Sequence, residues 1–363
     1  MSKAVKTLLK ILKWILIVLA AAIVLFFLVR FIGQRINTRT PEGGINETMF
    51  VDINGTKQWI SIYGQDRDNP VLLYLHGGPC NPTSTWDWQV FRRISDVYTV
   101  VNWDQRGCGH NYPDYKEHAP INAEIMLADG KAMTDFLCEH LQKEQITLYG
   151  NTWGSIFAAN LALDHPEKYE KLIVSALVVD EEISRDAFRS YLLEHSADDP
   201  EIHAAAEQFD PAVGLTEQKD LLMKLAFSKY IYADDILHDT EFNWFTACYF
   251  NPYCTLPEIY RSLFYPPELD AYTEMLLDGH PFGDVLCGEI PISGRTAYQM
   301  PFYLIEGDKD HGVSTMVEVA ADYYEQVQAP DKAIFYNTGG HGSTMLRCDQ
   351  LSDHIHVIAD RQP

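Results

Sequence analysis

The chain has 363 residues, of which 47% are hydrophobic, so it has enough apolar residues for a large core and is long enough for an α/β domain with an insertion. Its first 41 residues contain seven basic and no acidic residues, which leaves 21 basic against 51 acidic residues in the remainder. This acidic body excludes nucleic acid as an expected partner, because it would repel phosphate groups. Seven scattered cysteines without a CxxC or Cys/His cluster predict neither a disulfide framework nor a metal site, and we expect no cofactor.

The N-terminal segment predicts a membrane anchor. The run WILIVLAAAIVLFFLV between Lys13 and Arg30, with its apolar flanks, has the roughly 20 residues that a spanning helix needs. A cleaved signal peptide is the alternative, because small alanines occur in the run, but the apolar residues continue beyond them. We therefore expect residues 1–33 to be an uncleaved single-pass anchor in membrane lipid. Residues 34–46, which contain QRINTRTPEGGI, are expected to be a linker, and the flanking charges slightly favour a body outside the cytoplasm.

Residues 47–179 are typical of the first part of an α/β core. Two strand-like runs, TMFVDI and KQWISIY, flank Asn54-Gly55, a strong hairpin signal. Apolar runs suited to buried strands then alternate with helical patterns: strands are expected at 70–76, 98–104, 145–150 and 171–179, and helices at 122–142 and 153–165. Such alternation predicts a mostly parallel sheet with helices on both faces.

The alternation stops in residues 180–297, which are aromatic, acidic and helical in pattern and contain no clear buried strand. It resumes in residues 298–363, with strand-like runs in MPFYLIEGDKD and KAIFYNTGGHG. An insertion between a fourth and a fifth parallel strand is typical of a lid. We therefore expect a helical lid over residues 180–297 and a second part of the core over residues 298–363.

Three side chains at predicted strand ends suit acyl transfer, which needs a nucleophile, a base and an acid that orients the base. The stretch LYGNTWGSIFA has the pattern of a nucleophile elbow, GxSxG, with Thr152 at the serine position. His341, in the glycine-rich NTGGHGS, is the expected base. Asp310 is the expected acid, and it is preferred over Asp308 because it lies on the outgoing loop.

Backbone donors for an oxyanion are also expected. The segment LHGGPC follows the first buried strand, and its glycines let N–H groups face a ligand. We expect the oxyanion hole to consist of the N–H groups of Gly78 and of Trp153, which follows the elbow residue. The order Thr152, Asp310, His341 along the chain is the order of nucleophile, acid and base in an α/β-hydrolase.

Five segments together, LHGGPC, NWDQRGCGHN, GNTWGS, GDKD and GGHG, resemble the prolyl iminopeptidase branch (peptidase S33 type) of the α/β-hydrolases. The family patterns are HGGPG, DQRGxGxS, GGSWGS, GxxD and GGH. The resemblance covers roughly residues 47–360 and implies a serine-type hydrolase that removes N-terminal residues, often proline, from short peptides. This chain departs from it at Cys80, Asn111 and Thr152, where the family has glycine, serine and serine.

The resemblance also implies that carboxylates of the lid bind the free amine of the substrate. No motif selects among the lid acids; the candidates are Glu181, Glu182, Glu194 and Glu241. Arg106 and Asp104 of the DQRG segment are expected to brace a loop beside the site, because Arg favours bidentate pairing with a carboxylate. Cys80 and Cys108 are expected to be thiols of the pocket wall, with a disulfide between them as the alternative.

Two hypotheses follow from Thr152. In the first, the protein is a membrane-anchored hydrolase with a Thr-His-Asp triad, acting on a small peptide or on another amide or ester. In the second, it is a pseudoenzyme that binds a ligand under the lid, because the β-branched side chain of Thr152 is strained at the positive φ of an elbow. The intact His341, Asp310 and glycine loop favour the first hypothesis.

Overall fold

The structure is a computed structural model that describes residues 2–115, 120–231, 242–280 and 283–361. Within these residues eight strands form one sheet in the order β1-β2-β4-β3-β5-β6-β7-β8. The β1/β2 and β2/β4 pairs are antiparallel and the other five pairs are parallel. The strands are β1 (Ile45–Ile53), β2 (Thr56–Gly64), β3 (Val71–Leu75), β4 (Thr99–Trp103), β5 (Ile146–Asn151), β6 (Tyr169–Ser175), β7 (Phe302–Gly307) and β8 (Lys332–Asn337).

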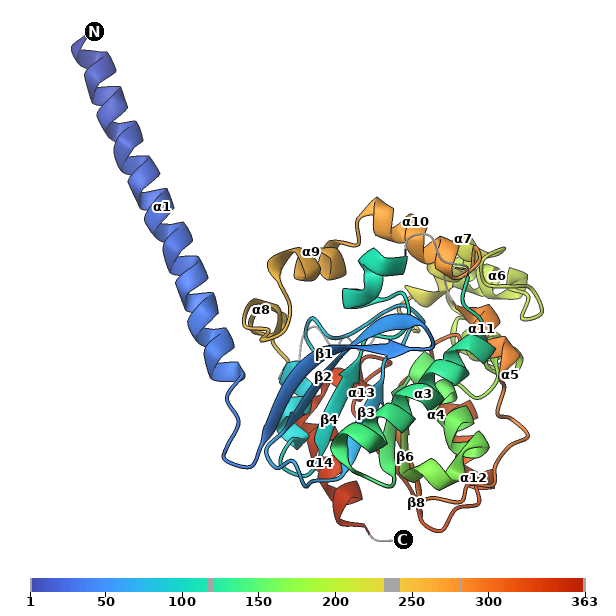
Figure 1. Cartoon of the computed structure of the whole chain (residues 1–363). Helices are drawn as coiled ribbons and strands as arrows, with labels where there is room; N and C mark the ends of the chain where they lie inside the picture. The colour runs from blue at the N-terminus through green and yellow to red at the C-terminus, as the bar shows by residue number, and fades with distance from the viewer. Residues whose placement is uncertain (1, 116–119, 232–241, 281–282, 362–363) are drawn as a thin grey trace.

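Helices cover both faces of the sheet because alternate strand residues point to opposite sides. On β3, Leu73 and Leu75 pack toward α3 (Ala123–Leu141), α4 (Trp153–Asp164) and α12 (Val317–Gln326). Leu72 and Tyr74 pack toward α2 (Trp88–Phe91), α13 (Ser343–Leu346) and α14 (Cys348–Asp360). Figure 1 shows α3 in front of the sheet and α14 behind it. Three short 3₁₀ helices complete the core: η1 (Arg92–Ile94), η2 (Gly109–Tyr115) and η3 (Pro166–Lys168).

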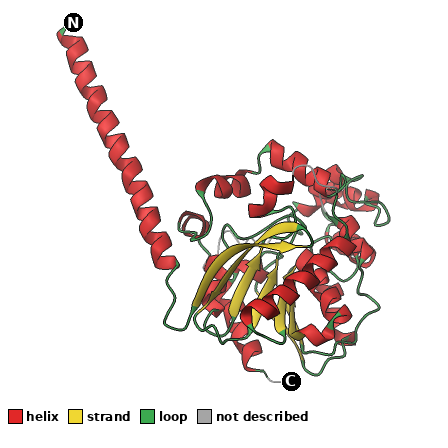
Figure 2. Ribbon diagram, in the orientation of Figure 1, coloured by secondary structure: helices red, strands yellow, loops and turns green. Residues whose placement is uncertain are grey.

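The insertion, residues 180–297 between β6 and β7, is helical wherever the structure describes a regular element in it (Figure 2). Its first helices pack around Phe188, Phe209 and Leu225 in a small cluster that also includes Met316, which directly precedes α12. Its helices are α5 (Glu181–His195), α6 (Pro200–Gln208), α7 (Lys219–Ala226), α8 (Trp244–Tyr249), α9 (Leu256–Phe264), α10 (Pro267–Leu276) and α11 (Asp284–Glu289). Because these strands are parallel, the insertion leaves the sheet at the carboxyl end of β6, the edge at which β5 and β8 also end, and returns to the amino end of β7.

The N-terminal helix α1 (Lys3–Asn37) projects from the body (Figure 1). It is long and apolar enough to cross a membrane, and a signal sequence would have the same character. The helix continues through Asn37, into the stretch 34–46 that the sequence pattern predicts as a linker. The side chains of Gln34 and Asn37 donate to the backbone oxygens of Asn251 and Phe250, at 2.7 and 3.0 Å, and these bonds stabilise the last turn.

Candidate active site

The candidate nucleophile lies at a sharp turn between β5 and α4. Thr152 has φ +52° and ψ −120°, the positive φ that the elbow pattern predicts. The turn needs glycine on both sides: a Cβ on Gly150 would overlap the carbonyl oxygen of Gly154, and a Cβ on Gly154 would overlap that of Leu75. Because α4 approaches β3 and β5 so closely, only glycine fits two residues before and two residues after Thr152.

The structure brings Thr152, His341 and Asp310 together from three strand ends. The Oγ1 atom of Thr152 is 3.0 Å from Nε2 of His341, and Nδ1 of His341 is 2.9 Å from Oδ2 of Asp310. Asp308 faces elsewhere and accepts a hydrogen bond from the N–H of Gly339 at 2.8 Å. Asp310, the residue preferred from the sequence, is therefore the carboxylate that contacts His341.

The surroundings of His341 favour its charged form. Desolvation lowers the pKa of this imidazole, whose side chain is 48% exposed, but the charge and hydrogen bond of Asp310 outweigh this effect and leave the pKa above its ordinary value. Asp310 is fully buried, and its Oδ1 accepts hydrogen bonds from the Thr315 hydroxyl and the Gly312 N–H, each at 3.0 Å. These donors hold the carboxylate in the orientation that contacts His341.

A second carboxyl group lies beneath the site. Glu306 is fully buried near the end of β7, and one of its oxygens accepts from the N–H of Leu177 at 2.8 Å. Burial, and after it the nearby charge of Asp310, raise the pKa of Glu306 well above its ordinary value. In the sequence, the presence of an acidic residue within the apolar run FYLIEG could have indicated that Glu306 is a buried carboxyl group near the site. No such signal marked Thr315.

The glycine loop lies against the elbow. A Cβ on Gly77 would come within 3.2 Å of the Cβ of Thr152, and the next residue, Gly78, has φ +117°. Trp153 is the first residue of α4, and its indole N–H donates to Gln105 Oε1 at 3.0 Å. The amide of Gln105 in turn donates to the backbone oxygen of His76 at 3.1 Å. Gln105 thus ties the glycine loop to the elbow, a role that the sequence pattern did not indicate.

The structure distinguishes among the acids of the insertion that were expected to bind the substrate amine, because they differ in exposure. Glu182 and Glu194 are exposed, and Glu241 lies outside the described residues. Glu181 is buried at the start of α5, and its carboxylate accepts from the Ser314 hydroxyl at 3.1 Å. Because Ser314 precedes Thr315, Glu181 is connected to the loop that holds Asp310.

Glu181 belongs to a group of buried charges. Its carboxylate is 3.4 Å from Nε of Arg185, whose Nη2 is 3.0 Å from Oδ2 of Asp284. Burial raises the pKa of Glu181 to about 7, against the opposing charge of Arg185. The three residues line an open cavity with an empty volume of about 990 Å³. With both carboxylates ionised, the group has one negative charge in excess.

A second cavity, with an empty volume of about 610 Å³, lies between two core loops and the insertion. The loops are residues 80–85 and 107–112, and the insertion contributes residues of α9 and α10. Cys80 and Cys108 are free thiols in its wall, as expected. Arg106 beside it pairs with Asp129 through two bonds of 2.6 and 2.7 Å, the bidentate bracing that the sequence predicts.

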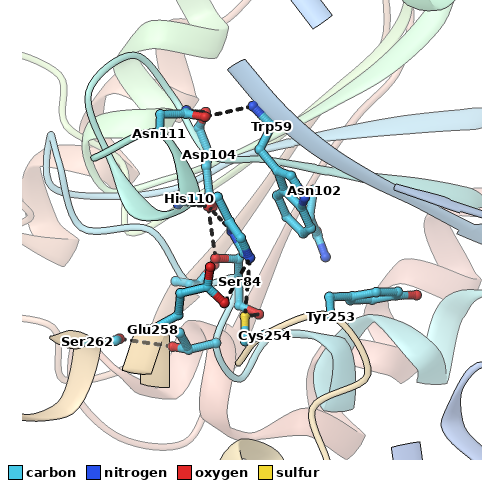
Figure 3. A network of polar contacts seen from close by, with 12 residues as sticks. Trp59, Ser84, Asn102, Asp104, His110, Asn111, Tyr253, Cys254, Glu258 and Ser262 are labelled. Atoms are coloured by element: carbon cyan, nitrogen blue, oxygen red, sulfur yellow. Dashed lines mark hydrogen bonds and ion pairs between the residues drawn. The ribbon is translucent and has the colours of Figure 1, made fainter. Parts of the chain in front are cut away.

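His110 and Asn111 follow the DQRG segment and make a buried polar network (Figure 3). Asn111 accepts from the N–H of Trp59 at 2.8 Å. His110 contacts Asp104 through Nδ1 at 2.6 Å, and its Nε2 lies 3.7 Å from Cys254 Sγ and 3.8 Å from Glu258 Oε2. The donor atoms of His110, Cys254 and Glu258 lie within 4.8 Å of one another, a grouping of residues far apart in the sequence that sequence reasoning missed. The network joins the core to α9.

The comparisons with known proteins agree with this fold. Residues 70–206 match the family described as alpha/beta hydrolase fold. The chain is 34% identical over 119 residues to a probable aminopeptidase, YbaC, of Bacillus subtilis, a match that covers 33% of this chain and 37% of that protein. It is 33% identical over 113 residues to a putative proline iminopeptidase of Mycoplasma pneumoniae, covering 30% and 33%. The matched segment thus spans about a third of each relative.

Solved structures resemble a larger part of the chain. A membrane phospholipase A, described as a novel bacterial virulence factor, superposes with a TM-score of 0.57 at 17% identity over 98% of both chains. A proline iminopeptidase of Mycobacterium smegmatis superposes with a TM-score of 0.57 at 18% identity over 86% of this chain and 97% of that one. At these identities the likeness establishes the fold alone. The chain has the α/β-hydrolase fold.

Proposed function

We propose that this chain of α/β-hydrolase fold is a membrane-anchored hydrolase that cleaves an amide or ester bond with Thr152, His341 and Asp310. The observation that carries the proposal is the hydrogen-bonded series from Thr152 Oγ1 through the imidazole of His341 to Asp310, with contacts of 3.0 and 2.9 Å. Both distances are within the range in which a base accepts a proton from a nucleophile and an acid orients the base.

The chemistry follows from this order. As Thr152 Oγ1 bonds to the acyl carbon, its proton passes to Nε2 of His341, and Asp310 stabilises the resulting imidazolium through Nδ1–H. The N–H groups of Gly78 and Trp153 stabilise the oxyanion. His341 then returns the proton to the leaving nitrogen or oxygen as its bond to carbon breaks. In the second half of the reaction, water bonds to the acyl carbon as His341 takes its proton. His341 then returns this proton to Thr152 Oγ1 as the bond between Oγ1 and the acyl carbon breaks, which releases the acid.

A peptide with a free N-terminus is the proposed substrate. The excess negative charge of Glu181, Arg185 and Asp284 beside the Asp310 loop would attract a cationic amine. The relatives called aminopeptidase and proline iminopeptidase support the same class of substrate. An ester or amide unrelated to peptides would use the same three residues and would differ in what the insertion binds.

A pseudoenzyme is the second candidate, and one observation favours it. Thr152 is a β-branched residue at φ +52°, where its methyl group restricts χ1 beside Gly77. A hydroxyl that is misaimed by this restriction would leave the cavities able to bind a ligand without turnover. The two candidates differ only in what the Thr152 hydroxyl does.

The deciding experiment compares wild type, Thr152→Ser and Thr152→Ala on N-terminal prolyl and alanyl chromogenic amides and on a short acyl ester. The hydrolase proposal requires wild type to exceed Thr152→Ala on at least one of these substrates. Equal background rates in wild type and Thr152→Ala, with activity gained in Thr152→Ser, would assign the chain to the pseudoenzymes. A fluorophosphonate that labels Thr152 only when His341 is present is an independent measure of nucleophile activation.

We also propose that α1 is a retained anchor and that the body lies outside the cytoplasm. The apolar run continues past the small alanines, and α1 makes specific contacts with the body. Protease added to intact cells should remove the body and leave α1 in the membrane. Full protection under conditions where a periplasmic or surface control is digested would place the body inside, and a chain that lacks α1 after export would identify a signal sequence.

A further inference from the structure

The C-terminal part of α1 is bonded to the segment around α8. The buried guanidinium of Arg30 donates to the backbone oxygens of Cys248, Tyr249 and Cys254, with the bond to Cys254 at 2.7 Å. One helical turn earlier, the backbone oxygen of Phe26 accepts from the Tyr249 hydroxyl, and the two rings lie 4.8 Å apart. These contacts fix α8 beside α1 at the level of residues 26 to 30.

This level corresponds to the surface of a bilayer. The uncharged run from Trp14 to Val29 has 16 residues and is about 24 Å long as a helix, so it fits within a hydrocarbon core of about 30 Å. Arg30 ends the run, and Phe26 lies about 6 Å before it along the helix axis. Tyr249, which contacts Phe26, is therefore at the boundary between hydrocarbon and headgroups, and α8 ends there.

Exposed apolar side chains continue from α8 onto α9. Phe245 is 67% exposed, Phe264 is 68% exposed, and Trp244 is also exposed. On α9 the exposed residues Tyr260, Leu263 and Phe264 follow the spacing i, i+3, i+4, so they form one stripe along the helix. Figure 1 shows α8 beside the end of α1 that is nearest the body, with α9 and α10 along the upper edge of the body.

The opposite side of α9 is fixed to the core. Glu258 lies 3.8 Å from His110, and the hydroxyl of Ser262 makes a 2.9 Å hydrogen bond with that of Thr85 (Figure 3). Glu258 also accepts from the N–H of Thr255 at 2.6 Å and so caps the helix. With its polar side held in this way, α9 cannot turn its apolar stripe into the protein.

We propose that the outer face of α8 and α9, formed by Trp244, Phe245, Tyr260, Leu263 and Phe264, is a second membrane contact that rests in the headgroup region of the bilayer spanned by α1. The proposal rests on the anchorage given under the proposed function. Aromatic and leucine side chains are those that such an interface accepts.

The charged residues around this face indicate which lipid headgroups it prefers. Apart from Glu258, whose carboxylate faces His110, the charged residues of α9 and α10 around the stripe include Arg261, Glu268 and Glu274, so the contact is apolar in origin and favours zwitterionic lipid over anionic lipid. Because Glu258, Arg261 and Ser262 of α9 also line the cavity beside Cys80 and Cys108, the contact places α9 between that cavity and the bilayer.

The test is photo-crosslinking of the full chain in nanodiscs of phosphatidylcholine and phosphatidylethanolamine. Benzoylphenylalanine replaces Phe245, Phe264, Val357 or Leu25 in separate variants, and lipid adducts are identified by mass spectrometry. Val357 on α14 is 48% exposed and serves as the matched control on the body, while Leu25 reports on α1. The expected result is a lipid adduct at Leu25, Phe264 and Phe245, with only background at Val357. The variants should keep the thermal midpoint of the wild type, because each replaced side chain is exposed.

The remaining outcomes overturn the proposal in distinguishable ways. An adduct at Leu25 with none at Phe245 and Phe264 would leave the anchor in place and exclude the second contact. A crosslink from Phe264 to another copy of the chain would identify the face as a dimer interface. Equal lipid adducts at Phe264 and Val357 would show unspecific lipid collision, and no adduct at Leu25 would exclude the anchor itself.

Discussion

Thr152 Oγ1 lies 3.0 Å from His341 Nε2 although the backbone of Thr152 is held at φ +52°. The N–H of Thr152 donates to the Ser175 oxygen at 3.0 Å, and the backbone packs so closely at Gly150 and Gly154 that a Cβ on either would overlap a carbonyl oxygen. The residue therefore retains a strained conformation that also directs its hydroxyl to the imidazole. Strain at a functional position is maintained by the structure around it and costs about 1–3 kcal/mol.

Replacing Thr152 by glycine should therefore stabilise the protein. Glycine adopts this φ without strain, and after its greater loss of backbone entropy, about 0.5–1 kcal/mol, we expect a net gain of about 1 kcal/mol in the free energy of unfolding. Thermal denaturation of Thr152→Gly against wild type measures the gain, and Thr134→Gly within α3 is the control that should lose stability. A lower midpoint for Thr152→Gly would show that the elbow is not strained.

The pH dependence should identify Asp310 as the residue that orients His341. A general base must be neutral, and the raised pKa of His341 means that activity falls as the pH drops through a value above 6.5. In Asp310→Asn the charge that raises this pKa is absent, so the acidic limb of the profile of activity against pH should move to lower pH. The maximal rate should fall roughly a thousandfold to ten-thousandfold, as for other triads that lose the acid.

Asp308→Asn is the matched control for this pH experiment. It removes a carboxylate two residues away that accepts from Gly339 rather than from His341, so the acidic limb should stay where it is in the wild type. The pH dependence of kcat/KM, which reports the free enzyme, is the measurement. A limb that moves equally in both variants would contradict the assignment of Asp310.

Glu181 should contribute to the binding of a free amine. Its pKa of about 7 is raised, so the carboxylate is protonated below that pH and charged above it. For a substrate with a free N-terminus, KM should therefore rise as the pH falls through 7, and Glu181→Gln should raise KM about tenfold while removing this dependence. An N-acetylated substrate and Glu182→Gln, at the exposed neighbour, should show neither effect. Equal KM changes on free and acetylated substrates would contradict an amine-binding role.

Gly154 should tolerate no side chain. A Cβ there would overlap the carbonyl oxygen of Leu75, a backbone atom in the middle of the sheet that cannot move aside. We expect Gly154→Ala to lose at least about 3 kcal/mol of stability, at the upper end of overpacking costs. Gly288→Ala is the control, because Gly288 lies in α11 with open space around its Cα, and alanine there should gain up to about 1 kcal/mol. Comparable thermal midpoints for the two variants would disprove the steric argument.

The sequence was most informative where one local pattern determines the position of a residue. Buried apolar runs predict the parallel strands, and Asp310 and His341 meet because each follows one of two neighbouring strands. Thr315 could not be predicted in the same way, because its contact with Asp310 depends on the path of a loop. Glu306 could have been noticed, since a charged residue within an apolar strand is unusual.

Arg30 was the least predictable of these residues. In the sequence it ends an apolar run and resembles any basic residue at the edge of a membrane anchor. Its partners are more than 210 residues away in the insertion, and only the folded chain brings their carbonyl groups to one guanidinium. Long-range contacts of this kind follow from the whole topology and not from any local pattern.

The bonds of Arg30 should hold α8 and the residues after it in place. In Arg30→Met the backbone oxygens of Cys248, Tyr249 and Cys254 lose this donor in a buried position, and each group left unsatisfied costs about 1–3 kcal/mol. Hydrogen exchange measured on the detergent-solubilised full chain should show faster exchange in residues 244–256, with little change in the central strands. Arg35→Met is the matched control, because Arg35 is an exposed residue of the same helix that lies over the ring of Phe31. If Arg30→Met exchanged no faster than Arg35→Met in this segment, α1 would not be what orders α8.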